Sequence, residues 1–178
     1  MAHFAEIKSD NNIVLRVIIA NDEDIKNNGG EYSTQSEQWA KNNYPNDPLI
    51  LEELGGIYPQ TYWKQTSYNT RAGEHKLGGT PKRKNYAGTG MFYDSQKDAF
   101  YWPKTTASWI YNEQKGEFEP PITKPNVYQI NNKPVIVEWD EENLRWKGIT
   151  LNLINGPDNT APYNSYYWNT NTSSWIQI

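Results

Sequence analysis

The stretch Trp139-Asp140-Glu141-Glu142-Asn143-Leu144-Arg145-Trp146 shows the pattern from which the fold can be predicted. An aromatic residue is followed by Asp or Asn, and a second aromatic comes seven residues after the first. The same pattern occurs in three other places, Tyr93-Asp94…Phe100, Tyr111-Asn112…Phe118 and Trp168-Asn169…Trp175. Repetition of both spacing and chemical type indicates an internal repeat.

Each copy predicts a β-hairpin. Asp and Asn favour turns because their side chains bond the nearby backbone and tolerate left-handed geometry. The two aromatic rings would then face one another across the strands and fix the register of the pair, which contributes about 0.2–1 kcal/mol relative to an alanine pair. A single hairpin is only marginally stable in water, so the copies are expected to pack on other parts of the chain or on a partner.

The region before the repeats predicts a hairpin followed by helices. Alternation over residues 4–8, the turn-forming run 9–12 and the β-branched run 13–20 predict two paired strands. Residues 22–30 are interpreted as a loop from their composition. One short helix is expected from Thr34 to about Tyr44, and a second from Pro48, with Asp47 as its N-cap and Gly55-Gly56 after its end. Residues 62–68 predict a strand, and the glycine-rich, basic run 71–90 predicts a long loop or an extended arm.

These patterns predict a mainly β chain with a minor helical part. We expect an N-terminal β-rich domain over residues 1–120, which includes the helices and the basic loop, and a C-terminal lobe of two Trp-locked hairpins over residues 121–178. The 178 residues have a mean hydropathy of −0.91, contain no Cys, and include 8 Trp and 13 Tyr. A thin core rich in Tyr and Trp favours a protein that is supported by assembly with partners.

Charge is distributed unevenly along the chain. Residues 1–60 carry 4 Lys or Arg against 10 Asp or Glu, residues 61–110 carry 8 against 3, and residues 111–178 carry 5 against 8. This order would permit complementary contacts between neighbouring copies, although solvated surface charge is the commoner explanation. The N-terminal residues lack the features of a secretion signal, and no run of residues predicts a membrane span.

The sequence gives little indication of catalysis. No phosphate-binding loop is present, His3 and His75 have no metal-site or nucleophile context, and the absence of Cys excludes thiolate chemistry. A hydrolase with paired carboxylates, for example one that uses Glu142, stays open because such pairs are defined in space. Asp140, Glu142 and Asn143 are expected to form a turn rather than a Ca²⁺ site. We therefore expect no enzyme activity and no cofactor or metal.

Two groups of residues are candidates for interaction. The first consists of tryptophans whose rings could stack on sugars: Trp102, Trp109, Trp139, Trp146, Trp168 and Trp175. Burial of the same rings in hairpin cores is the favoured interpretation. The second is the basic cluster Lys82, Arg83 and Lys84, which could meet an acidic patch on a neighbouring subunit. One short cluster in an acidic protein is weak evidence for nucleic-acid binding.

Several spaced motifs resemble one family of proteins. They are Phe4-Ala5-Glu6-Ile7, Asn11-Asn12-Ile13-Val14, Arg16-Val17-Ile18, Gln65-Thr66-Ser67-Tyr68-Asn69, Arg83-Lys84-Asn85-Tyr86-Ala87-Gly88, Tyr93-Asp94, Asp98-Ala99-Phe100, Ser108-Trp109 and Trp139-Asp140-Glu141. In this order they resemble a family of short proteins of marine tailed phages, notably cyanophages, over residues 3–20 and 63–146. The run 71–81 and the hairpin 168–175 depart from the shorter pattern of that family.

The resemblance implies a phage product and a component of the virion, and it supplies no catalytic or binding residues. Together with the composition, it predicts an accessory structural protein of the particle, made in the host cytoplasm and docked on the capsid surface, the neck or tail, or the base of a fibre. Other virion proteins are the expected partners, with a homo-oligomer or symmetric array as the form of assembly. The alternative is a carbohydrate-binding module that recognises a host cell surface through exposed tryptophans.

Overall fold

The structure is a computed structural model that describes residues 1–151 and 163–178. Its elements, in chain order, are β1 (Ala2–Lys8), β2 (Val14–Ala20), α1 (Asp22–Asn27), α2 (Thr34–Asn43), α3 (Pro48–Glu53), β3 (Thr61–Thr66), β4 (Thr70–Arg71), β5 (Glu74–His75), β6 (Phe92–Asp94), β7 (Ala99–Tyr101), β8 (Ile110–Asn112), β9 (Glu117–Glu119), β10 (Gln129–Ile130), β11 (Lys133–Asp140), β12 (Arg145–Leu151), β13 (Tyr163–Asn169) and β14 (Ser174–Gln177). The chain is mainly β with a minor helical part, which confirms the expected fold class.

The chain divides into two compact units, which are described separately. The first contains Met1–Pro103 and Tyr111–Phe118, and the second contains Lys104–Ile110 and Glu119–Ile178. The division expected from the sequence, 1–120 and 121–178, differs from these units chiefly because Lys104–Ile110 groups with the C-terminal residues.

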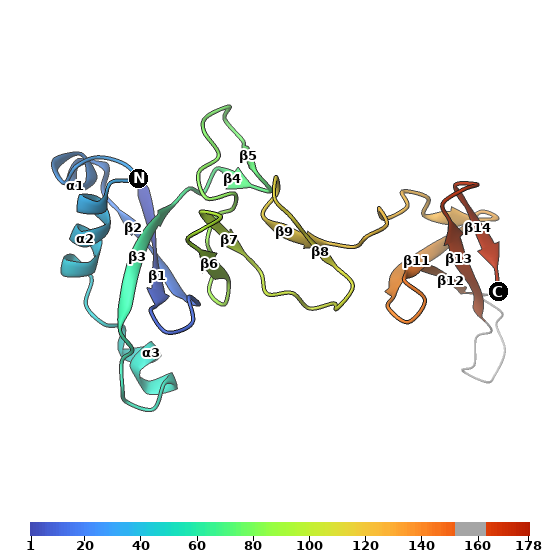
Figure 1. Ribbon diagram of the computed structural model, residues 1–178, viewed down its shortest axis with the longest axis horizontal. Helices are drawn as coiled ribbons and strands as arrows, with labels where there is room; N and C mark the ends of the chain where they lie inside the picture. Colours follow the sequence, from blue (N-terminus) through green and yellow to red (C-terminus); the bar gives the residue numbers. More distant parts are fainter. Residues whose placement is uncertain (152–162) are drawn as a thin grey trace. The chain divides into compact units, whose positions relative to one another are not determined.

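The first unit is built on a three-stranded antiparallel sheet in the order β2-β1-β3. The sheet carries a core on each face because alternate side chains of β1 point to opposite sides. Phe4 packs with Ile25 of α1, Ala40 of α2 and Trp63 of β3 on the face covered by the helices. On the other face, Ile7 belongs to a second core that includes residues of the hairpin β6-β7. Figure 1 shows α1 and α2 beside the sheet, with β6 and β7 nearby.

The helices differ in how well the sequence predicts them. α3 begins as expected, with Asp47 accepting a hydrogen bond from the amide of Leu49 and Pro48 in the first turn. α2 is capped by Ser33, one residue before the expected start. The prediction of a loop over residues 22–30 is wrong for α1: Asn21 caps this helix, and Asp22, Glu23 and Asp24 occupy its first turn, where carboxylates favour helix formation.

All four repeats form the predicted hairpins. Three of the ring pairs are directly opposed in the strand register, Tyr93 with Phe100, Trp139 with Trp146 and Trp168 with Trp175. The Tyr111 and Phe118 rings make the fourth pair, between β8 and β9. Ring centroids are 5.0–5.4 Å apart in the four copies, with the planes tilted or edge to face, which is a favourable arrangement for aromatic pairs.

The four hairpins also share one turn. The side chain of the Asp or Asn accepts backbone N–H groups two or three residues further on, as Asp94 does from Gln96 and Lys97, and Asn169 from Asn171 and Thr172. The residue five positions after the first aromatic has a positive φ in every copy: Asp98 at 43°, Gly116 at 69°, Leu144 at 49° and Ser173 at 47°. A single four-residue loop geometry thus closes all the repeats.

Replacing Leu144 with glycine should stabilise the second unit by about 1 kcal/mol, because a left-handed backbone is costly for a residue with a Cβ and almost free for glycine. The control is Glu142→Gly, which changes an exposed residue of the same loop whose φ is not positive and should lower stability slightly. The measurement is urea unfolding followed by tryptophan fluorescence. Equal effects of the two glycines would contradict a strained Leu144.

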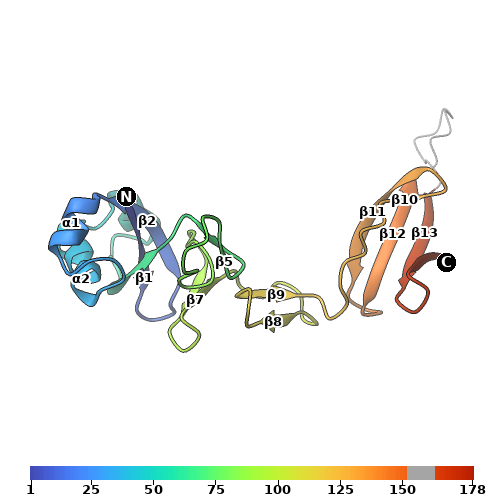
Figure 2. The same ribbon diagram turned by 90° about the horizontal axis from the view of Figure 1, so that it is seen from above.

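The second unit is a five-stranded antiparallel sheet in the order β10-β11-β12-β13-β14. Figure 2 shows β11, β12 and β13 side by side. Gly148 lies in β12, the middle strand of this sheet. A Cβ added to Gly148 would come within 2.9 Å of the Trp175 ring and 2.8 Å of the Val135 side chain. The absence of a side chain at this position therefore makes room for the aromatic rings that form the core of the sheet.

Candidate functional site

Four of the five tryptophans of the second unit, those of its two Trp-paired hairpins, serve as scaffold. Trp146 is buried, and its indole N–H donates to the backbone carbonyl of Ile122 at 2.8 Å. The indole N–H of Trp175 donates to the carbonyl of Val127 at 3.1 Å, so the connector that precedes β10 runs along the ring-bearing face. Trp139 and Trp168 are half-buried and paired with these rings. Trp146 is therefore buried, as the favoured interpretation expects, while Trp139, Trp168 and Trp175 are only partly buried.

The hairpin that bears Trp139 is also tied to the segment before it. Glu141 accepts hydrogen bonds from the amide and hydroxyl of Ser108, at 2.8 and 2.6 Å, and from the Trp139 indole at 2.8 Å. These bonds lower the pKa of Glu141. The hydrogen bond from the Ser108 hydroxyl has the largest effect, and the one from the Trp139 N–H has the next largest. In the same loop, Asp140 accepts from the amide and side chain of Asn143, which is the expected turn.

The basic cluster is not a continuous surface patch. Arg83 is 8% exposed and donates to Glu37 at 2.8 Å, to Asp98 at 3.1 Å and to the carbonyl of Gln65. Lys82 is exposed and lies over the Tyr32 ring, while Lys84 is half-buried. The expectation that Arg83 contacts a partner from an extended arm is therefore wrong. Its guanidinium is buried and forms ion pairs with two carboxylates of the first unit.

Trp102 differs from the other candidates. It is 60% exposed, and in the described part of the chain its ring pairs with no other aromatic. Its six-membered ring lies against the turn at Gly88 and Gly90, where added Cβ atoms would be 3.8 and 3.6 Å away. Trp109, by contrast, is half-buried, and its indole nitrogen is buried without a hydrogen-bond partner among the described residues.

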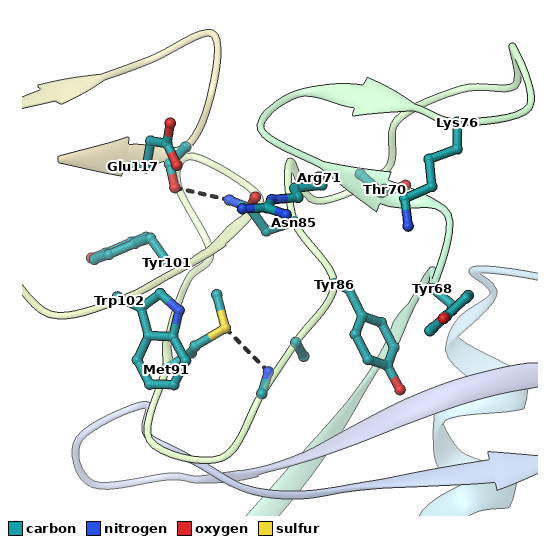
Figure 3. Close-up of a pocket in the computed structure, with 13 residues that line it drawn as sticks. Tyr68, Thr70, Arg71, Lys76, Asn85, Tyr86, Met91, Tyr101, Trp102 and Glu117 are labelled. Atoms are coloured by element: carbon teal, nitrogen blue, oxygen red, sulfur yellow. Dashed lines mark hydrogen bonds between the residues drawn. The ribbon is translucent and has the colours of Figure 1, made fainter. Parts of the chain in front are cut away.

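Trp102 lies at one side of a cleft of about 470 Å³ in the first unit. Figure 3 shows Tyr101 and Trp102 on one side and Tyr68 and Tyr86 on the other, with Arg71 in the region between them. The residues come from segments that are separated in the chain: the residues just after β3, the β4-β5 hairpin, the run after Arg83, the end of β7 and the start of β9. The cleft is therefore a product of tertiary packing.

Asn85 holds these segments together. Its side-chain oxygen accepts from the amide of Ala72 at 2.7 Å. Its amide nitrogen donates to the carbonyls of Phe100 and Gly116, both at 2.9 Å, and lies 3.2 Å from that of Lys115. One side chain thus joins the β4-β5 turn, strand β7 and the β8-β9 hairpin, which are the elements that carry the cleft.

The tyrosine side of the cleft is held by ring contacts. Tyr68 and Tyr86 meet edge to face at 5.6 Å, and the Tyr86 hydroxyl lies 2.9 Å from Nδ1 of His3. Burial raises the pKa of Tyr86, so its hydroxyl is protonated at neutral pH. Across the cleft, Tyr101 packs edge to face on Tyr111 at 5.3 Å, and burial raises the pKa of Tyr111 to about 12. Both sides are therefore neutral aromatic surfaces.

The charged groups of the cleft are Arg71, Lys76 and Glu117, and Thr70 and Asn85 are also among its polar residues. The Lys76 ammonium lies 5.3 Å from the centroid of the Tyr68 ring. Thr70 is 1% exposed, and its hydroxyl has no hydrogen-bond partner among the described residues. Two cations against one carboxylate give the cleft a net positive charge, in contrast to the acidic chain as a whole.

Sequence reasoning identified only Trp102 among the cleft residues. Tyr68, Tyr86, Arg71 and Lys76 were missed, since nothing in their local spacing shows that Asn85 brings their segments together. Within residues 1–151 and 163–178, no three His, Asp or Glu side chains gather in a way that could hold a metal ion. No helix in the same part of the chain is both long and apolar enough to cross a bilayer.

Comparison with known proteins identified no relative of this chain. No protein-family model matches the chain, and searches of curated proteins and of solved structures found no significant match.

Proposed function

We propose that the chain is an accessory structural protein of a tailed-phage particle, which acts by docking on other virion proteins and not by catalysis. The docking place is the capsid surface, the neck or tail, or the base of a fibre. The sequence motifs that resemble proteins of marine phages support this assignment, as do the high content of Tyr and Trp and the low mean hydropathy of −0.91.

The observation that carries the proposal is the repeated hairpin. The chain uses one ring-paired, Asx-closed hairpin four times, and three of the four ring pairs are in direct register. Side chains that would be candidates for chemistry in another protein are here used in turns and ring pairs, as Asp94 and Asp140 are. A chain whose distinctive residues build a scaffold is suited to a structural role.

One face of the second unit supplies a surface suited to docking. Ile136 pairs with Ile149, Ile149 pairs with Ser165, and the amide of Ile178 donates to the carbonyl of Ser165. By strand alternation these residues lie on the face opposite the tryptophan rings. Ile136 is 57% exposed and Ile178 66%. Exposed β-branched residues grouped on a sheet favour contact with another protein surface.

The test is quantitative peptide mass spectrometry on gradient-purified particles of the phage that encodes the chain, with lysate from the same infection. A fixed ratio to the major capsid protein is the expected result. Hundreds of copies per particle would place the chain on the head, and a few or a few dozen would place it in the tail or fibre. Abundance in lysate with absence from particles would refute the proposal.

Matched variants address the docking face. Ile136→Asp should reduce the copies per particle, because a carboxylate would be desolvated in the contact. Ile19→Asp is the control, since Ile19 is 56% exposed but belongs to β2 of the first unit. Equal occupancy of both variants and the wild type would show that the face containing Ile136 is not the docking surface.

A further inference from the structure

We infer that the cleft between Tyr68 and Trp102 binds an acidic saccharide, that is, a short oligosaccharide with a carboxylate on a sugar ring. This inference goes beyond the proposed docking function and does not depend on it. It assigns a ligand class to a site of the first unit, whereas the docking face described above lies in the second.

Trp102 provides a stacking surface. An exposed indole can pack against the C–H face of a sugar ring. This contact buries apolar area, and the negative face of the aromatic ring attracts the C–H groups. The ring lies beside the backbone at Gly88 and Gly90, where a Cβ added to either glycine would come within ordinary contact distance of it. The side chain is 60% exposed even so. A large aromatic that lines a cleft and is left open to solvent is suited to binding a ligand.

Arg71 provides the recognition of an anion. Its side chain is exposed, and in the part of the chain that the structure describes it forms no ion pair and no hydrogen bond. A guanidinium binds a carboxylate through two parallel hydrogen bonds, which adds geometric selectivity to the attraction. Lys76 adds a second positive charge, held over the Tyr68 ring. Both cations line the same cleft as Trp102.

The remaining groups fit the hydroxyls of a sugar. Thr70 lines the cleft with a hydroxyl that has no hydrogen-bond partner among the described residues, and a buried polar group of this kind is costly unless a ligand or water satisfies it. Glu117 offers an acceptor at the edge of the cleft. The volume of about 470 Å³ lies within the usual range for small-molecule sites. Stacking, anion binding and hydroxyl recognition are thus available together.

The combination favours a saccharide over an acidic peptide. A peptide carboxylate would use Arg71 and Lys76 but would leave the Trp102 face without a matching ring. A neutral sugar would use the ring but would leave Arg71 without a partner. A ligand that carries both a pyranose ring and a carboxylate satisfies both sides of the cleft.

The experiment measures binding of the full chain by isothermal titration calorimetry to a panel of uronic-acid and sialic-acid oligosaccharides, with tetragalacturonate as the reference probe. The fully methyl-esterified tetramer keeps the rings and loses the charge. At least one acidic member should bind, and the affinity of its neutral counterpart should be at least about tenfold lower. Tetraglutamate, which has the charge without the rings, should also bind at least about tenfold more weakly.

Matched variants locate the site. Trp102→Ala and Arg71→Gln should each weaken binding by about tenfold or more. Tyr128→Ala and Lys41→Gln, which change an exposed aromatic and an exposed cation outside the cleft, should leave affinity unchanged. Thermal unfolding of all four confirms that each variant is folded. The inference is overturned if no acidic saccharide binds, if tetraglutamate binds equally well, or if the cleft variants bind like the wild type.

Discussion

Replacing Arg83 with alanine is expected to destabilise the first unit by about 3–5 kcal/mol, which is the usual cost of breaking a buried ion pair from one side. The guanidinium is 8% exposed and donates to Glu37, Asp98 and the carbonyl of Gln65. Glu37 is itself 7% exposed, so the loss of Arg83 would leave a buried carboxylate whose remaining ion-pair partner among the described residues is Lys64. The penalty comes from that stranded charge and from the lost hydrogen bonds.

The measurement is urea unfolding, combined with hydrogen exchange to separate the two units. Protection should fall for amides of β1 and β3 and stay unchanged for β11 to β14. Lys82→Ala is the matched control, because Lys82 is the exposed neighbour of Arg83 and its removal should change stability by about 0.5 kcal/mol or less. A loss no larger for Arg83→Ala than for Lys82→Ala would show that the ion pairs do not hold the unit together.

A double variant tests the physical origin of the effect. Arg83→Met combined with Glu37→Gln removes both charges together, so the desolvation penalty of a lone carboxylate disappears. The combined loss should therefore be smaller than the sum of the single losses. If the two single losses of stability instead add up to the loss in the double variant, Arg83 stabilises the unit through its packing, for example against the Tyr32 ring, whose centroid lies 5.4 Å from the guanidinium carbon.

Replacing Gly73 with alanine should have the next largest effect, about 3 kcal/mol, from a left-handed backbone and an overpacked contact. Gly73 has φ of 75°, and an added Cβ would lie 2.1 Å from the backbone carbonyl oxygen of Gln114. Backbone cannot rotate aside as a side chain can, so the β8-β9 hairpin has to move away from β4-β5. We expect lost protection of the amides in residues 111–118.

Gly78 offers a control for the backbone term alone. Its φ is 74°, and an added Cβ would have no atom within 4 Å. Gly78→Ala should therefore cost about 1 kcal/mol, the penalty of the left-handed conformation without a clash. The difference between the two variants measures the packing of the hairpin against the turn. Equal costs would mean that the contact at Gln114 relaxes freely.

The repeats could be predicted from the sequence because everything that defines them is local. The rings, the Asx side chain and the left-handed residue of each hairpin lie within eight consecutive residues, as in 139–146. The pairing of Trp139 with Trp146 needs no information from the rest of the chain. The start of α3 was predictable for the same reason, since Asp47 and Pro48 are adjacent signals.

The buried charges and the cleft could not be predicted in this way. Arg83 meets Glu37, which lies 46 residues away in the sequence, and Asn85 meets Gly116, which lies 31 residues away. In the sequence, Lys82, Arg83 and Lys84 have the same chemistry, and only the fold separates the buried member from its neighbours. Trp102 was predicted together with five other tryptophans, and exposure alone distinguishes it from them.

The hairpins and the N-terminal sheet differ in how far along the chain their partners lie, which has a consequence for the order of folding. An eight-residue hairpin closes in about 1–10 μs once its residues are available. Strand β1 must wait for β3, since His3 pairs with Thr66, and the hairpin β6-β7 that covers the sheet comes later still. During synthesis β1 and β2 are made well before the elements that cover them, so the β1-β2 hairpin stays open to chaperones or to misassembly until the chain reaches Phe100.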